Sequence, residues 1–425
     1  MKKMLFIALL IASGYTVSAQ EPPPKFIVSE PPDSRFLSFD KSMIEFMERR
    51  SIPGGTLAVV KEGRLVYAQG YGFADKERKE KARATSLFRI ASISKPITSL
   101  ALLHLIQEKS AKFSLETRPF LLLDTQPTLE SGKEIDPRLQ KITILNLLQH
   151  TAGWDRNKSG DPMFDSANIA PKVGDPAPAS PNSIIRYMMG KPLDFDPGTK
   201  EAYSNFGYCV LGRIIEQVSG KKYEQYVKEE ILEPMGITRM RLGKSLRSGK
   251  ARGEVTYYQP NLGVTPSVFP QGDREVPWCY GGFNLEAMDS HGGWLASAVD
   301  LARFCAKLDS PAPTLLNPEM LQALYARPKP PVGLDADGSP KAAYYACGWM
   351  VRPVGNKANY WHTGSLPGTF SLLVRRHDGI SWVVLFNQRS EGDTPSDNDI
   401  DSALHIAANA VKDWGSHDLF SRYFR

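Results

Sequence analysis

The sequence predicts an α+β fold, in which an antiparallel sheet built from both ends of the chain is flanked by helices. Near the N-terminus, two β-type runs at residues 55–60 and 65–72 enclose the short turn "KEGR". A matching hairpin at residues 368–387 turns at His377-Asp378-Gly379. The clearest helical patterns lie between these hairpins. We therefore expect one sheet formed by the two hairpins, with a mainly helical region inserted at approximately residues 100–290.

The individual elements follow from periodicity. Apolar residues at helical spacing predict a first helix within residues 34–50, and "DSALHIAANAVKDW" predicts a last one at residues 401–414. In the middle, residues 143–150 and 206–220 are predicted helices, and Gly220 is a plausible C-cap of the second. Residues 161–182 and 259–282 are rich in Gly and Pro and are interpreted as long loops.

The first 19 residues have the order of a secretory signal peptide. Lys2-Lys3 precede the apolar stretch at residues 4–12, and Val17-Ser18-Ala19 places small residues before a cut after Ala19. A buried N-terminal helix is the alternative interpretation. Residues 20–34 are expected to form an extended leader and residues 35–415 the folded domain. The mature protein is then periplasmic or secreted. No stretch approaches the roughly 18 apolar residues of a membrane helix, so no stable membrane insertion is expected.

Charge and cysteine spacing narrow the classes of partner. The net charge of the whole chain is +6, and it falls to +4 after removal of the signal peptide. The charges are interspersed, so nucleic-acid binding is not expected. Four separated cysteines without paired histidines predict no metal site and no cofactor, and they leave disulfide formation open: Cys209, Cys279, Cys305 and Cys347. For those at 209 and 305, which lie in apolar helical patterns, a free buried thiol is supported at least as well as a disulfide.

Three Ser-x-x-Lys sequences could each place an amine beside a serine hydroxyl. They begin at Ser38, Ser92 and Ser219. Such a serine becomes nucleophilic only when a neighbouring base takes its proton, and a lysine can do so when burial keeps it neutral. Ser38 belongs to a terminal helix facing solvent, and Ser219 lies at the wrong, C-terminal end of its helix for stabilising an oxyanion. Ser92 precedes an apolar helix whose start is fixed by Pro96, so Ser92-Lys95 is the candidate pair.

Two further motifs give Ser92 partners. Tyr203-Ser204-Asn205 immediately precedes a predicted helix, and His362-Thr363-Gly364 leads into the late hairpin. With "ITILNLLQHTAGW" and "GGWLASAVDLARF", this ordered set resembles the serine β-lactamase and penicillin-binding protein superfamily. The similarity is to the branch of class C β-lactamases, DD-peptidases, family VIII carboxylesterases and D-amino-acid peptidases. It spans roughly residues 35–412.

The resemblance implies roles for these residues. Ser92 would be acylated, and Lys95 and Tyr203 would share proton transfer in a division that is left open. Asn205 would bind the acyl side-chain amide, and Thr363 and Gly364 would line the site. The N–H groups of Ser92 and Ser365 would form the oxyanion hole. His362 stands where β-lactamases usually carry lysine, and it is expected to titrate near neutrality and to anchor a carboxylate weakly.

Taken alone, Tyr203 and His362 would each be read as structural residues. The similar sequence His150-Thr151-Ala152-Gly153 closes a helix and is interpreted as structural. The expected function is an exported, metal-independent serine hydrolase that cleaves an amide or ester in a small-molecule or peptide substrate. A true β-lactamase, or a sensor that is acylated without turnover, is the alternative. The oligomeric state is not predicted.

Overall fold

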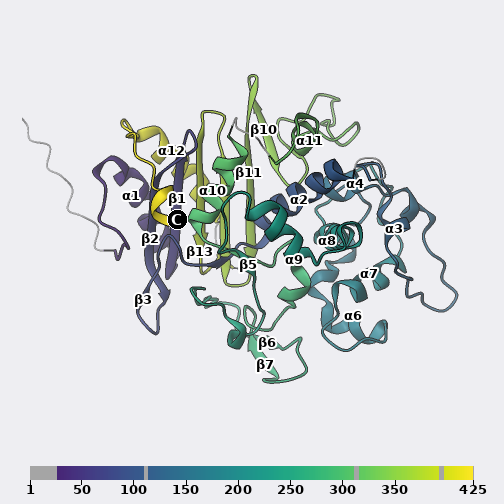
Figure 1. The fold of residues 1–425 in the computed structure, drawn as a ribbon. Coiled ribbons are helices and arrows are strands. Elements are labelled where there is room, and N and C mark those ends of the chain that lie inside the picture. Colours follow the sequence, from purple (N-terminus) through teal and green to yellow (C-terminus); the bar gives the residue numbers. More distant parts are fainter. Residues whose placement is uncertain (1–25, 110–112, 311–314, 392–396, 425) are drawn as a thin grey trace, which may run out of the picture.

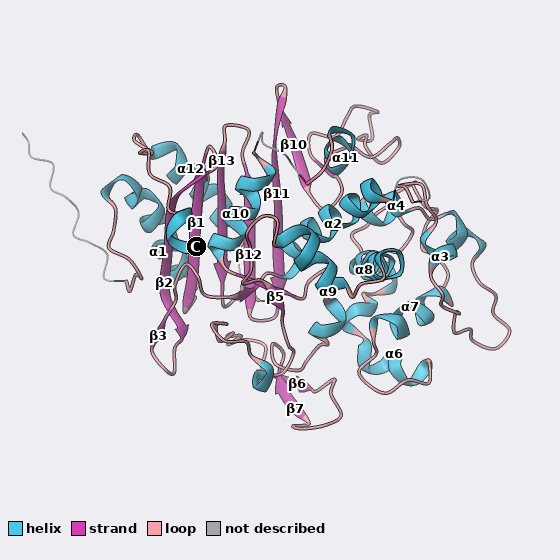
Figure 2. Cartoon of the chain, viewed as in Figure 1, coloured by secondary structure: helices cyan, strands magenta, loops and turns pink. Residues whose placement is uncertain are grey.

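The computed structural model describes residues 26–109, 113–310, 315–391 and 397–424. The expected signal peptide and residues 20–25 of the expected leader lie outside these ranges. Figures 1 and 2 show a sheet with helices on both faces, beside a larger helical region. The predicted α+β class is therefore confirmed, with the strands of the two chain ends side by side in one sheet.

The main sheet has eight strands, and every neighbouring pair is antiparallel. The two predicted hairpins form its centre, because β1 pairs with β13 from Gly55 opposite Phe386 to Lys61 opposite Ile380. In spatial order the strands are β3 (Glu80–Lys81), β2 (Arg64–Asp75), β1 (Gly54–Lys61), β13 (Ile380–Phe386), β12 (Thr369–Arg375), β11 (Lys357–Leu366), β10 (Met350–Val354) and β9 (Tyr344–Tyr345).

Two hydrophobic layers cover this sheet, because successive side chains of a strand point to opposite faces. On β1, Leu57 and Val59 belong to the core beneath α1 (Leu37–Arg49) and α12 (Asp399–Ala410). Ala58 and Val60 belong to the larger core, which continues through α10 (Ala298–Leu308) into the helical region. Figure 1 shows α1 and α12 at the end of the molecule remote from that region.

The helical region is organised around α2 (Ser94–Glu108) and α8 (Asn205–Ser219), which pack against each other. Ser204 caps the N-terminus of α8, and Gly220, with φ of 73°, ends it as predicted. The other helices are short: α3 (Pro119–Leu122), α4 (Ile144–Leu148), α5 (Arg156–Ser159), α6 (Ser166–Lys172), α7 (Pro181–Met189), α9 (Tyr223–Tyr226), α11 (Pro318–Leu324) and α13 (Phe420–Tyr423).

Small strands and helical turns complete the structure. One minor sheet orders β4, β8 and β5, and another pairs β6 with β7. The bounds are β4 (Phe88–Arg89), β5 (Arg241–Leu242), β6 (Val264–Pro266), β7 (Glu275–Pro277) and β8 (Trp294–Ala296). Turns of 3₁₀ helix lie at Ser34–Phe36, Ala91–Ile93, Pro137–Lys141, Pro162–Phe164, Arg247–Gly249 and Leu285–Met288, and a π-helical turn follows α9 at Val227–Leu232. Within the described part of the chain, no helix has both the length and the apolar character needed to cross a membrane.

The expected loops at residues 161–182 and 259–282 are wrong in part. The first contains a 3₁₀ turn, α6 and the start of α7, because Asp161 and Ser180 act as N-caps and Pro162 and Pro181 follow them at N1. The second contains the β6–β7 hairpin. The last long helix ends at Ala410, four residues earlier than expected. The His-Thr-Gly motif lies inside β11, a strand that the sequence analysis did not predict.

Candidate active site

Ser92 lies in the 3₁₀ turn that leads directly into α2. The preceding residue, Ala91, has a φ of +46°, a left-handed conformation that costs free energy for a residue with a side chain. The neighbouring strands hold this backbone in place. Ser371 Oγ on β12 donates to Ile90 O at 2.8 Å, and a Cβ at Gly364 on β11 would lie 2.1 Å from the same oxygen. The turn therefore presents Ser92, half-buried, beside the edge of β11.

Lys95 is completely buried, and its amine joins three groups. Nζ lies 3.0 Å from Ser92 Oγ, 2.8 Å from Asn205 Oδ1 and 3.1 Å from His291 O. The amide and carbonyl oxygens can only accept, whereas the serine hydroxyl can also donate. A neutral amine, with two N–H groups and one lone pair, satisfies all three partners when its lone pair faces Ser92. Burial holds the pKa of Lys95 well below its usual 10.5, with Asp161 opposing this shift and Arg156 adding to it.

Tyr203 and Asn205 reach the site from the N-terminus of α8. The ring of Tyr203 lies 4.7 Å from Lys95 Nζ. Burial raises the pKa of the Tyr203 hydroxyl, and its hydrogen bond with Ser92 acts in the opposite direction. Asn205 Nδ2 donates to Asp161 Oδ2 at 2.7 Å, which directs the amide oxygen toward Lys95. The structure thus brings the first two predicted motifs together.

His362 lies on β11 and is also buried. Its Nδ1 lies 2.6 Å from Thr363 O, which can only accept, so Nδ1 carries the proton and Nε2 accepts from Tyr345 OH at 3.0 Å. Burial and the nearby Lys95 lower the pKa of His362 to about 3. The expectation that His362 titrates near neutrality is therefore wrong. The ring is neutral at physiological pH and supplies no cation.

The remaining residues of the third motif follow along β11. Thr363 is half-buried and Gly364 is buried, whereas Ser365 is exposed and is opposite Phe370 of β12. Arg389, beyond β13, donates to Ser365 Oγ at 3.2 Å. The oxyanion hole formed by the N–H groups of Ser92 and Ser365 stays a prediction.

The two rejected Ser-x-x-Lys sequences lie elsewhere. Ser38 is on α1, where its hydroxyl donates to Ala407 O of α12, so its neighbour is a helix rather than the expected solvent. Lys41 is exposed. Ser219 is the last residue of α8, as the sequence indicated.

Several residues of the site were not identified from the sequence. His150, interpreted as structural, accepts a hydrogen bond from the Ser204 N–H at 3.2 Å and lies 4.3 Å, between ring centroids, from both Tyr203 and Tyr345. Burial lowers the pKa of His150 well below 6.5, so its imidazole is uncharged and lines the site beside Tyr203. Asp161 lay in an expected loop. Neither Asp161 nor Tyr345 has a local sequence signal, because their partners are remote in the chain.

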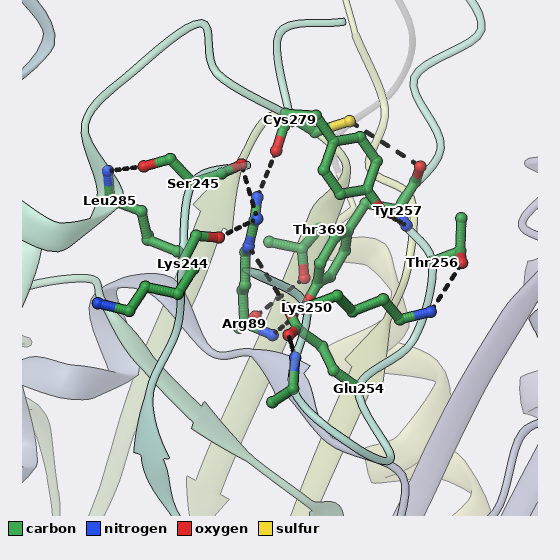
Figure 3. A network of polar contacts seen from close by, with 12 residues as sticks. Arg89, Lys244, Ser245, Lys250, Glu254, Thr256, Tyr257, Cys279, Leu285 and Thr369 are labelled. Carbon is green, nitrogen blue, oxygen red and sulfur yellow. Dashed lines mark hydrogen bonds and ion pairs between the residues drawn. The ribbon is translucent and has the colours of Figure 1, made fainter. Parts of the chain in front are cut away.

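A buried polar network anchors the segment before the turn that carries Ser92 (Figure 3). The Arg89 guanidinium donates to Lys244 O at 2.7 Å, and its Nε lies 3.8 Å from Glu254 Oε1. Tyr257 OH donates to the same carboxylate at 2.8 Å and accepts from the Arg89 N–H. Both charged side chains are 1% exposed. This network fixes Arg89 three residues before Ser92.

Glu254→Gln is expected to destabilise the fold by about 3 kcal/mol, because it leaves a buried guanidinium without its counter-charge. Urea unfolding followed by circular dichroism measures this as a lower midpoint at unchanged slope. The matched control is Glu130→Gln, which breaks the exposed ion pair with Lys191 and should leave the midpoint nearly unchanged. Equal midpoints for Glu254→Gln and the unsubstituted chain would show that the network contributes little.

The four cysteines, all within the described residues, are buried and unpaired. Burial raises the pKa of each thiol, for Cys279 to about 11 and for Cys347 to about 12. Thiols in this state are poor nucleophiles at neutral pH. In the described ranges, no group of three or more His, Cys, Asp or Glu side chains is arranged to hold a metal ion.

A serine at the start of a buried helix, with a lysine, a Tyr-x-Asn element and a His-Thr-Gly strand around it, defines the serine β-lactamase and penicillin-binding protein class. Comparison with known proteins agrees. The Beta-lactamase family model matches residues 39–405, and the chain belongs to this family. The resemblance inferred from the sequence is thereby confirmed.

Individual similar proteins share the fold or part of the sequence. A probable fimbrial assembly protein FimD of Dichelobacter nodosus is 36% identical over 188 residues, which cover 44% of this chain and 43% of that protein. The octameric penicillin-binding protein homologue from Pyrococcus abyssi has a TM-score of 0.65 at 24% identity, covering 90% of this chain and 78% of that one. D-amino acid amidase from Ochrobactrum anthropi SV3 also has a TM-score of 0.65, at 19% identity and 89% and 99% coverage.

Proposed function

We propose that this protein is a serine hydrolase that cleaves an amide or ester through an acyl intermediate on Ser92. The observation that carries the proposal is the setting of Lys95. Its buried amine contacts two groups that can only accept and one hydroxyl that can donate. Complete burial favours the neutral lysine, and in that state its lone pair can be directed at Ser92, which is what a general base requires.

In the proposed acylation, Ser92 Oγ forms a bond with the substrate's carbonyl carbon while its proton passes to Lys95 Nζ. The carbonyl oxygen becomes an oxyanion that accepts from the backbone N–H groups of Ser92 and Ser365. When the bond to the leaving group breaks, the proton is delivered to the departing nitrogen or oxygen, directly or through the Tyr203 hydroxyl. Water then attacks the acyl-serine, gives up a proton to the same base, and releases the acid as Ser92 regains its hydrogen.

The neutral charge of His362 favours open-chain amides and esters over β-lactams as substrates. A fixed cation at the position of His362 would bind the carboxylate of a β-lactam, whereas the neutral His362 cannot do so. A DD-peptidase-like or esterase-like activity therefore fits this site better. The structural similarity to a D-amino acid amidase is in keeping with an amide substrate but shows the fold alone.

Stopped-flow measurement with a p-nitrophenyl ester tests this function. We expect a burst of one nitrophenolate per active site, followed by steady turnover, because the proposed base can also activate water. For a chromogenic cephalosporin, kcat/KM should be about 10- to 100-fold lower than for the ester, since a charged hydrogen bond to the cephalosporin carboxylate is missing. A burst without steady turnover would instead identify a sensor, and rapid cephalosporin hydrolysis would identify a β-lactamase.

The proposal includes export. Residues 1–19 have the charge and hydropathy order of a signal peptide, with cleavage after Ala19, so the mature chain would begin at Gln20 and act in the periplasm or outside the cell.

A further inference from the structure

Arg156 is an exposed cation at the edge of the proposed active site. It is the first residue of α5, and its guanidinium carbon lies 4.8 Å from the centre of the Tyr203 ring. The same ring contacts Lys95 Nζ at 4.7 Å. A guanidinium that stacks by its face on an aromatic ring keeps its N–H edge free, and that edge matches the two oxygens of a carboxylate.

The backbone that carries Arg156 is held firmly. Asp155 caps α5 by accepting from the Asn157 N–H at 3.0 Å. Trp154 is buried and packs edge-on against Phe206, at 4.7 Å between ring centroids, one residue beyond Asn205. The backbone at Arg156 is thus held close to the Tyr203–Asn205 element, which places the guanidinium beside the Tyr203 ring.

Arg156 is not paired with a neighbouring acid. It forms no ion pair and no side-chain hydrogen bond with any residue in the part of the chain that the structure describes. Asp155 accepts from Lys200 Nζ at 2.7 Å. Asp161 accepts from Asn205 Nδ2 and from the Met163 N–H. Arg389, the cation beside Ser365 on the opposite side of the site, differs because Glu391 holds it in an ion pair.

We propose that Arg156 binds a carboxylate on the acyl portion of the substrate, so that the enzyme prefers amides or esters whose acyl group carries a second, free carboxylate. This inference rests on the proposed function. The family resemblance assigns the acyl side-chain amide to Asn205, and Arg156 lies on the same side of the site, against the ring of Tyr203. The negative charge of the substrate is therefore recognised by the helical region.

Two p-nitrophenyl esters of adipic acid, one with the distal carboxylate free and one with it methylated, test this inference. The ratio of their kcat/KM values isolates recognition of the carboxylate and cancels any effect of a substitution on Tyr203. We expect a ratio of about 10 or more, as for a hydrogen-bonded charge pair. It should fall to nearly 1 in Arg156→Met, mainly through KM, and to an intermediate value in Arg156→Lys. Lys158→Met, which removes another exposed cation of α5, should leave the ratio unchanged.

A binding measurement separates this inference from the proposed function. Fluorescence polarisation with a fluorescein-labelled adipic acid monoamide, and with its methyl ester, needs no turnover when Ser92→Ala is used. Tighter binding of the free acid that is lost on adding Arg156→Met supports the inference, even if neither ester is hydrolysed. Equal binding of both probes, or equal kcat/KM values in the unsubstituted enzyme, overturns it. So does a preference for the free acid that Arg156→Met leaves unchanged.

Discussion

Ser92→Ala is expected to lower kcat/KM for a p-nitrophenyl ester by about 10⁴-fold or more, because removing the proposed nucleophile eliminates the covalent route. The side chain is half-buried and small, so the fold should be retained, and an unchanged urea midpoint would verify this. Labelling by a fluorophosphonate probe should be lost with turnover. The measurement is initial-rate kinetics at equal concentrations of folded protein.

The chain supplies its own matched controls for this substitution. Ser38→Ala and Ser219→Ala alter the other two Ser-x-x-Lys sequences, on α1 and at the end of α8, and both should keep full activity and labelling. Full turnover in Ser92→Ala, or loss of turnover in either control, would remove Ser92 from the mechanism.

Lys95→Met is expected to lower kcat by about 10²- to 10⁴-fold, the range of a general base. Methionine approximates the length of lysine and carries no charge, so the buried site should accept it. Lys41→Met and Lys222→Met are the matched controls and should be fully active. Activity of Lys95→Met close to that of the unsubstituted enzyme would transfer the role of base to Tyr203.

The protonation state of Lys95 determines the direction in which kcat/KM changes with pH. A general base must be deprotonated, so the rate should rise as the pH passes upward through the pKa of Lys95. Because burial lowers that pKa, the plateau should be reached well below pH 10.5. The rising limb should disappear in Lys95→Met. A rise that persists in this variant would assign the titration to another group.

Much of the fold could be predicted because its central elements have strong local patterns. The hairpins β1–β2 and β12–β13 are rich in apolar residues, and nearly all of their residues are buried. By contrast, β11 reads "KANYWHTGSL" and is mostly half-exposed, so it lacks both alternation and an apolar run. Its identity as a strand depends on pairing with β10 and β12, which is not a local property.

The residues of the site likewise fall into those that local sequence predicts and those that only tertiary packing brings in. Ser92, Lys95 and Asn205 could be placed because a helix start and a fixed spacing determine where their side chains lie. Asp161 and Tyr345 could not, because they meet Asn205 and His362 only through tertiary packing. His362 shows the limit most clearly. Its residue type suggested a group that titrates near neutrality, whereas burial beside Lys95 lowers its pKa to about 3. Because His362 is neutral, the third motif provides no cation to bind a substrate carboxylate.

The most direct test of the central claim is the intact mass of the protein quenched in acid during turnover of a slowly hydrolysed ester. The mechanism predicts a mass increase equal to the acyl group, mapped by peptide sequencing to Ser92 and absent from Ser92→Ala. Steady hydrolysis without an adduct under conditions that trap the burst, or an adduct on any other residue, would contradict it.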